Sequence, residues 1–117
     1  MINRPKTIIC DIDGVLFKHQ GDICKQHLGD PIILEGVKEK IKEWDLKGFH
    51  IILLTGRRES TRIETERQLT NAGIIYDNLI MNVGSGVRVL INDKKPTGDD
   101  NTAKAICIER NKGLSEL

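Results

Sequence analysis

Short apolar runs alternate along the chain with amphipathic stretches, and the apolar runs are rich in β-branched residues. Residues 7–11 and 49–55 form the two clearest runs, and the second is almost continuously apolar, as in a central strand of a parallel sheet. Shorter strand-like runs follow at 79–81 and 87–92, and residues 103–108 form a last strand or strand–helix element. This alternation predicts an α/β fold, a Rossmann-like three-layer sandwich around a central, mostly parallel sheet.

Two amphipathic segments between these runs predict helices. Apolar residues recur at helical spacing over 34–47, and Gly48 follows as a stop. Trp44 belongs to that apolar stripe, and we interpret it as core packing. A second, charged helix is predicted over 60–71. The tail after Arg110 is expected to be frayed.

The stretch Ile8–Leu16, Ile-Ile-Cys-Asp-Ile-Asp-Gly-Val-Leu, carries the strongest chemical signal. Asp11 and Asp13 are separated by one residue, so both project to the same side of a strand that ends here. Two like charges this close repel each other unless a cation or a shared proton compensates. Gly14 lets the backbone turn sharply or approach a ligand. A solvated turn is the alternative interpretation, because Asp and Gly are ordinary turn residues.

Polar residues also follow the later apolar runs. One run leads into Thr55-Gly56-Arg57, and another leads into residues 92–95, Asn-Asp-Lys-Lys. Ligands of an open parallel sheet bind outside the carboxyl ends of its strands, so these groups are expected to share one rim with Asp11 and Asp13. Carboxylates from two strands suit a hard cation such as Mg²⁺. A hydroxyl and exposed amides at a helix N-terminus suit phosphate oxygens.

Composition narrows the class of protein further. The 117 residues suit a single domain over 1–117, and 18 basic against 17 acidic residues leave a net charge of +1. That balance, with one Trp, one Tyr and two Phe, argues against nucleic acid or a membrane surface as a partner. No apolar run approaches the ~20 residues of a membrane span, and no signal-peptide pattern is present. Cys10, Cys24 and Cys107 are odd in number and lack CxxC spacing, which indicates reduced thiols in a cytoplasmic protein.

These residues resemble the motifs of a known family. Asp11-Ile-Asp13-Gly14-Val15, Thr55 closing one apolar run and Asp93 closing a later one resemble motifs I, II and IV of the haloacid dehalogenase (HAD) superfamily. The resemblance spans roughly residues 7–96, and its overall pattern is similar to small capless members associated with bacterial polysaccharide biosynthesis. It implies a Mg²⁺-dependent HAD-type phosphatase acting on a small phosphomonoester, such as a sugar phosphate.

The resemblance also implies a role for each matching residue. Asp11 would attack phosphorus and form an aspartyl-phosphate, which an ionised carboxylate can do without prior deprotonation. Asp13 would protonate the leaving oxygen and then activate water. Mg²⁺ would lie between Asp11, the backbone carbonyl of Asp13 and Asp93. Thr55 and the amide of Gly56 would hold phosphoryl oxygens.

The sequence departs from the family pattern in its basic residues. Superfamily members usually supply a Lys or Arg between the second and fourth motifs, and this chain has no lysine between Lys47 and Lys94. Arg88 lies in that interval, but it starts the predicted fourth strand, several residues of about 3.3 Å each away from the rim. We favour Arg57 or Lys95 as the substrate-binding cation, with a solvated surface charge as the alternative for each.

A second departure is Asn92 beside Asp93, where an acidic pair is common. An amide is a weaker metal ligand than a carboxylate, so a slow or degenerate active site is an alternative. The first connector, 17–33, leaves no room for a cap domain, and the site is then open or closed by a neighbouring subunit of a homo-oligomer. His19 and His27 of this connector are candidates to line the entrance, although a surface role is simpler.

Three classes of function therefore compete. A capless phosphatase explains the most residues. A catalytically weak HAD-like subunit or regulatory partner would explain the missing lysine. A receiver-type phospho-acceptor domain has a similar length and sheet architecture, but receivers carry the acceptor Asp on the third strand, and this chain offers Thr55 near the corresponding point.

Overall fold

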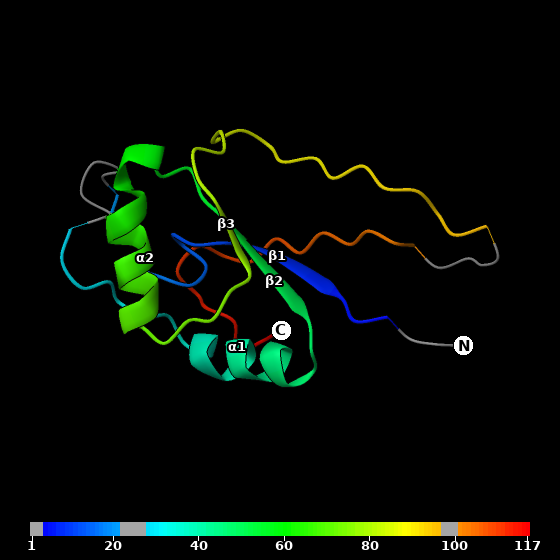
Figure 1. Cartoon of the computed structure of the whole chain (residues 1–117), viewed down its shortest axis with the longest axis horizontal. Helices are drawn as coiled ribbons and strands as arrows, with labels where there is room; N and C mark the ends of the chain where they lie inside the picture. Colours follow the sequence, from blue (N-terminus) through cyan, green and yellow to red (C-terminus); the bar gives the residue numbers. More distant parts are fainter. Residues whose placement is uncertain (1–3, 22–27, 97–100) are drawn as a thin grey trace.

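The computed structural model describes residues 4–21, 28–96 and 101–117. The elements follow the order β1 (Thr7–Asp11), α1 (Val37–Leu46), β2 (His50–Leu54), a short 3₁₀ helix η1 (Glu59–Thr61), α2 (Arg62–Asn71) and β3 (Asn78–Ile80). The strands form one parallel sheet in the order β1-β2-β3 (Figure 1). The predicted α/β class and both predicted helices are confirmed.

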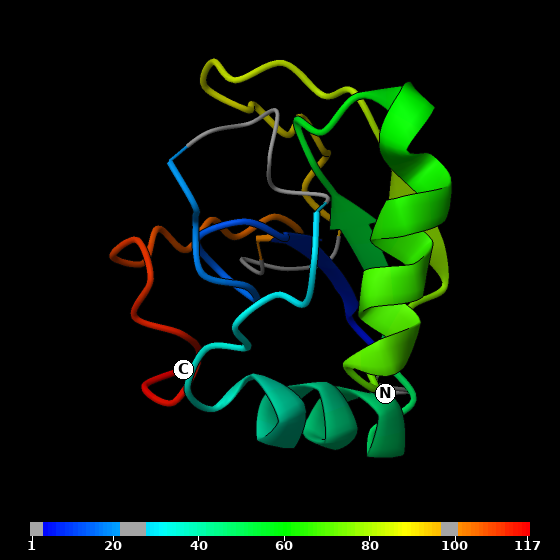
Figure 2. The ribbon, with the colours of Figure 1, turned by 90° about the vertical axis from the view of Figure 1, so that its left-hand side faces the viewer.

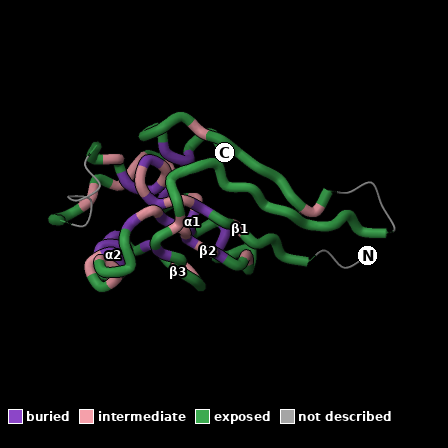
Figure 3. Tube along the Cα trace, turned by 90° about the horizontal axis from the view of Figure 1, so that it is seen from above, coloured by how far each residue is buried: buried purple, intermediate pink, exposed green. Residues whose placement is uncertain are grey.

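One face of the sheet carries the hydrophobic core. Alternate residues of β1 and β2, among them Cys10, Ile51 and Leu53, are buried together with side chains of both helices. Figure 3 shows these buried positions gathered where the strands and helices meet. The cluster also takes in Val37, Ile41, Trp44 and Leu69 from the helices. Trp44 is 7% exposed, so its assignment to the core is confirmed.

The other face of the sheet is only partly covered. Ile9 of β1 is 47% exposed and Ile80 of β3 is 48% exposed, and Ile52 and Leu54 between them are half-buried. Because side chains alternate along a strand, these four residues lie on the face opposite the core. The described residues therefore form two layers, with α1 and α2 contributing to the same core (Figure 2).

The segments 84–96 and 101–108, which we call the arm, extend away from this body (Figure 1). Neither predicted strand of the arm, at 87–92 or 103–108, forms in the structure, so both predictions are wrong. Val87 is 93% exposed and Ile91 is 89% exposed. Six residues separate β3 from Val87, and a crossover to a parallel neighbour takes about a dozen or more.

The arm also determines the overall dimensions. The molecule measures 49 × 29 × 25 Å, with a radius of gyration of 15.1 Å. A compact chain of this length has a radius of gyration of about 13 Å. None of the helices in the described part of the chain is long and apolar enough to cross a membrane.

The C-terminal residues pack against the body, so the prediction of a frayed tail is wrong. Leu114 is 1% exposed, and its amide donates to the carbonyl oxygen of Glu35 at 2.8 Å. Gly113 has a φ of +83°, and a Cβ there would collide with the backbone of Glu35. Lys40 Nζ donates to the carbonyl oxygen of Leu117 at 2.8 Å. Burial of Leu114 and these backbone contacts together hold the segment in place.

Candidate functional site

The two acids of the first strand lie where the chain turns after β1. Asp11 is the last residue of β1, and its Oδ1 accepts the amide N–H of Ile12 at 2.8 Å. The amides of Val15, Leu16 and Phe17 all donate to the carbonyl oxygen of Ile12, which closes a tight turn. Gly14 has a φ of +89°, a conformation that favours glycine. This turn holds Asp13 beside the tip of the strand.

Arg57 binds the carboxylate of Asp13 through two hydrogen bonds. The guanidinium Nε donates to Asp13 Oδ2 at 2.9 Å, and Nη2 donates to Oδ1 at 2.8 Å. Nη1 donates to Thr65 Oγ1 at 3.1 Å and to Gln68 Oε1 at 2.6 Å, both on α2. The Arg57 side chain is only 2% exposed, and that of Asp13 is 10% exposed. Such a bidentate, charge-assisted pair fixes the orientation of the carboxylate.

Asp11 contacts a different arginine, Arg88, which is more exposed than Arg57. Arg88 Nη1 lies 3.3 Å from Asp11 Oδ2, and both side chains are 35% exposed. The expectation that Arg88 lies away from the rim is therefore wrong. It assumed that the fourth strand runs toward the rim, whereas the arm starts there and leads away (Figure 1).

Thr55 and Gly56 follow the tip of β2, next to the tip of β1. Thr55 is buried, and its amide donates to the carbonyl oxygen of Ile80 at 3.0 Å. Its hydroxyl accepts the amide N–H of Arg57 at 3.1 Å. The structure thus brings together Asp11, Asp13, Thr55, Gly56 and Arg57, five of the seven residues that the sequence singled out. Their individual roles in binding or catalysis stay predictions.

Asp93 and Lys95 lie elsewhere. Both are exposed on the arm, where Asn92 Nδ2 donates to the carbonyl oxygen of Thr102 at 3.1 Å and the Thr102 hydroxyl donates to that of Asp93. Over the described ranges, no three His, Cys, Asp or Glu side chains gather to hold a metal ion. Both oxygens of Asp13 face Arg57, and Asp11 faces Arg88. This arrangement does not fit a Mg²⁺ site, and we derive no chemical step through a metal.

Cys10, which precedes Asp11, has a thiol of low reactivity. Burial, and secondarily the charge of Asp11, raises the pKa of the Cys10 thiol to about 12. The thiol therefore stays protonated near neutral pH and is a poor nucleophile. Cys107 is exposed on the arm, and Cys24 and His27 lie outside the described residues. Among the side chains around the tip of β1, the nucleophilic candidate is Asp11.

The C-terminal tail supplies residues that sequence reasoning missed. The amide of Asn111 donates to the carbonyl oxygen of Gly14 at 2.8 Å, and Asn111 Oδ1 accepts the amide N–H of His19 at 2.7 Å. A Cβ at position 14 would lie 3.3 Å from Cγ of Arg110 and 3.9 Å from His19 Cβ. The tail therefore borders the turn that carries Asp13. No local signal in the sequence pairs residues so far apart.

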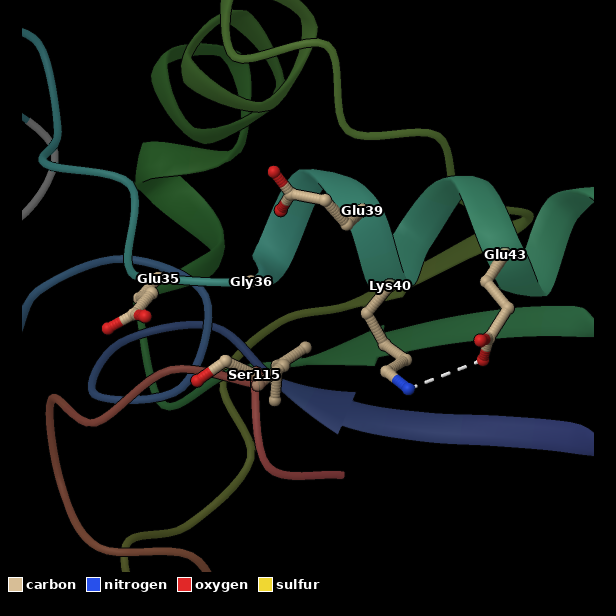
Figure 4. A pocket seen from close by; sticks show the side chains of 7 residues that line it. Glu35, Gly36, Glu39, Lys40, Glu43 and Ser115 are labelled. Carbon is tan, nitrogen blue, oxygen red and sulfur yellow. Dashed lines mark hydrogen bonds and ion pairs between the residues drawn. The ribbon is translucent and has the colours of Figure 1, made fainter.

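A hollow of about 380 Å³ lies at a different place. Glu35, Gly36, Glu39, Lys40, Glu43, Leu114 and Ser115 line it. Lys40 forms an ion pair with Glu43 at 3.3 Å on its α1 side (Figure 4). This hollow is bounded by α1 and the tail, and it includes none of the residues at the strand tips.

The chain is similar to solved structures over most of its length. A chain of the Pnkp1/Rnl/Hen1 complex is 32% identical with a TM-score of 0.60, over 73% of this chain and 30% of that chain. A chain of the Pnkp1/Rnl/Hen1 RNA repair complex is 31% identical with a TM-score of 0.56, over 72% and 28% respectively. This chain thus spans less than a third of the length of these two neighbours.

A third structural neighbour is more distant. It is the D,D-heptose 1.7-bisphosphate phosphatase from B. bronchiseptica, complexed with magnesium and phosphate, with 20% identity and a TM-score of 0.46. The similarity covers 68% of this chain and 51% of that chain. No protein-family model matches the sequence, and no curated protein matches it.

Proposed function

We propose that this chain hydrolyses phosphomonoesters through a covalent intermediate on Asp11. The observation that carries the proposal is the difference in exposure and in arginine partner between Asp11 and Asp13 at the tip of β1. The Asp13 side chain is only 10% exposed and is held by Arg57, whereas the Asp11 side chain is 35% exposed and lies beside the cation Arg88. A reacting carboxylate needs this combination of access and a nearby positive charge. The 32% identity to a chain of the Pnkp1/Rnl/Hen1 complex supports a related site.

The chemistry balances with the residues at hand. An oxygen of Asp11 attacks phosphorus, the bond from phosphorus to the ester oxygen breaks, and the leaving oxygen takes a proton that Asp13 has first taken up from solvent. Asp13, again ionised, accepts a proton from the water that attacks in the second half. Water then attacks the aspartyl-phosphate, which releases inorganic phosphate and restores Asp11. Arg88 is placed to offset the negative charge of the phosphoryl group as it approaches Asp11, because it already lies 3.3 Å from that carboxylate.

Asp13 and Arg57 act together in this proposal. Asp13 accepts two N–H bonds from Arg57, which is the geometry of an ionised carboxylate. That state suits the activation of water in the second half of the reaction. Protonating the leaving group in the first half requires Asp13 to break part of this pair. Arg57 is therefore a positioning residue in the arrangement described, and Thr55 with Gly56 borders the phosphoryl position.

The test is turnover of an aryl phosphate by the full chain, with and without Mg²⁺, combined with trapping of the intermediate. We expect release of inorganic phosphate and an adduct of one phosphoryl group on Asp11 in rapidly quenched protein, detected by mass spectrometry. Asp11→Asn should lose both signals. Adduct formation without turnover would favour a receiver-type domain, and absence of both would favour a non-catalytic subunit.

The substrate class has two candidates. A small sugar phosphate follows from the sequence resemblance, and a phosphate at the end of an RNA is suggested by the similarity to a chain of an RNA repair complex. Rates on a panel of sugar phosphates and on a short RNA with a terminal phosphate would separate them. A preference for the RNA would overturn the expectation that nucleic acid is not a partner.

A further inference from the structure

Two of the arginines near the strand tips already pair with carboxylates. Arg57 donates four hydrogen bonds to Asp13, Thr65 and Gln68. Arg88 forms an ion pair with Asp11. Arg110 is exposed, and within the described ranges no acidic side chain pairs with it. Its guanidinium is available to a ligand.

Arg110 is held next to the turn that carries Asp13. A Cβ at Gly14 would lie 3.3 Å from Arg110 Cγ and 3.9 Å from its Nε, so the side chain passes directly over this glycine. The backbone at the next residue is fixed, because the amide of Asn111 donates to Gly14 at 2.8 Å and Asn111 Oδ1 accepts from His19 at 2.7 Å. The backbone and the first side-chain carbons of Arg110 are thus held in place, whereas its guanidinium group is exposed to solvent.

The anchoring of the tail extends beyond these contacts. Leu114 is 1% exposed in the core and its amide donates to the carbonyl oxygen of Glu35 at 2.8 Å. Gly113 lies so close to Glu35 that no side chain would fit there. The backbone of the tail is therefore held against the body on both sides of Asn111, which keeps the base of the Arg110 side chain beside Gly14.

We propose that Arg110 forms an anion-binding subsite that selects phosphomonoesters carrying a second anionic group, a carboxylate or a second phosphate. This rests on the proposed phosphatase function. In this proposal, the scissile phosphate faces Asp11 and Arg88. The second anion of the same substrate pairs with Arg110, whose side chain lies beside Gly14, the residue that follows Asp13. Planar guanidinium groups bind carboxylate and phosphate oxygens in a bidentate manner, which makes both anions suitable.

The experiment compares matched substrates. Phosphoglycolate carries a carboxylate that ethyl phosphate lacks, and fructose bisphosphate carries a second phosphate that fructose monophosphate lacks. In Arg110→Ala, we expect the kcat/KM ratio of each charged substrate over its matched partner to fall about tenfold, the size of one charge-assisted hydrogen bond. The change should be in the KM of the charged substrate, and Arg110→Lys should recover part of it.

Lys112→Ala is the control variant, because Lys112 is a neighbouring tail cation that pairs with Glu109 at 3.7 Å. It should leave both ratios within about twofold. A fall in kcat on all four substrates in Arg110→Ala would show that Arg110 only positions the turn. An unchanged ratio would show that it is a solvated surface charge. Either result overturns the subsite.

A binding measurement separates this inference from the proposed reaction. Calorimetric titration of phosphoglycolate and ethyl phosphate into Asp11→Asn reports affinity without turnover. Adding Arg110→Ala to this variant should weaken phosphoglycolate binding about tenfold and leave ethyl phosphate unchanged. If the wild type hydrolyses none of the substrates but this difference persists, the phosphatase proposal fails and the subsite stands. If hydrolysis occurs and the difference is absent, the subsite fails alone.

Discussion

Two aspartate–arginine pairs lie at the tip of β1, and they differ in almost every physical respect. Asp13 and Arg57 are buried, with side chains 10% and 2% exposed, and two N–H groups bind the two carboxylate oxygens. Asp11 and Arg88 are each 35% exposed and share a single contact at 3.3 Å. The first pair joins the turn after β1 to α2 and the residues after β2, and the second joins β1 to the arm.

In the proposed reaction, this difference separates an acid held by a buried arginine from an acid that is accessible to a substrate. Breaking an ion pair that is almost fully buried leaves an uncompensated charge in a poorly solvated place, so separating Asp13 from Arg57 completely is costly. A partly exposed pair gains little net energy and can exchange its partner for a substrate anion. We therefore propose different roles for Asp11 and Asp13, although they are close in sequence and identical in type, because their arginine partners differ. Five predictions test this contrast, from the largest effect to the smallest.

Asp11→Asn should abolish phosphatase turnover while leaving the fold intact. The amide is not a nucleophile, so kcat should fall by about three orders of magnitude or more. Steady-state release of phosphate measures the loss, and circular dichroism checks the fold. Wild-type turnover in the purified variant would refute the assignment of Asp11.

Arg57→Ala should destabilise the protein far more than Arg88→Ala. The first change strands the buried carboxylate of Asp13 and should cost about 3–5 kcal/mol in the free energy of unfolding. The second removes a partly exposed pair and should cost less than about 1 kcal/mol. Urea unfolding of both variants measures the difference. If Arg57→Ala does not fold, Arg57→Lys, which keeps the charge and loses the bidentate geometry, gives the same comparison at a smaller cost.

Asp93 decides whether the arm has a further role at the strand tips. The sequence resemblance implies that Asp93→Asn raises the Mg²⁺ concentration for half-maximal activity and that Asn92→Ala raises it less, because Mg²⁺ prefers charged oxygen. The structure places Asp93 on the arm, so this result would require the arm to reach the tip of β1. Equal shifts in the two variants would argue against a metal role for Asp93. Activity after chelation measures the requirement itself.

The arm that carries Arg88 should also affect self-association. Val87, Val89 and Ile91 are 93%, 77% and 89% exposed, and apolar side chains on an extended segment favour association with another surface. A homo-oligomer is one of the two arrangements that the sequence left open, and if the arm forms its interface, Val89→Lys should lower the sedimentation coefficient at a fixed concentration. Ile63→Lys on α2, where Ile63 is 80% exposed, is the matched control. An unchanged or equally changed sedimentation profile would argue against the arm as the interface.

The smallest expected effect concerns the reactivity of Cys10, which tests how firmly the end of β1 is buried. Its pKa is raised to about 12 by burial and then by Asp11, so its thiolate is scarce at pH 8 and becomes accessible only on unfolding. Exposed Cys107 should react with iodoacetamide before Cys10 does. Peptide mass mapping over time measures the order. Fast labelling of Cys10 in the native protein would show that the end of β1 opens readily.

Much of the sheet was predictable, because β1 and β2 are short apolar runs and α1 carries its apolar residues at helical spacing. The acids Asp11 and Asp13 and the neighbouring Thr55 could be grouped at one rim for the same reason, since carboxyl ends of parallel strands lie together. The direction of the segment after β3 was not predictable from its own residues. A strand-like run looks the same whichever way it leaves the sheet.

The sequence by itself determined the α/β class and the two carboxylates at the end of β1, because both depend on the periodicity of adjacent residues. Only the tertiary structure decided which arginine each acid faces, that Arg88 reaches Asp11, and that the tail packs against Gly14. Those contacts join residues many positions apart, and they depend on the length of the connections and on the burial of Leu114. Local pattern carries information about neighbours in sequence, whereas the roles of these charges depend on neighbours in space.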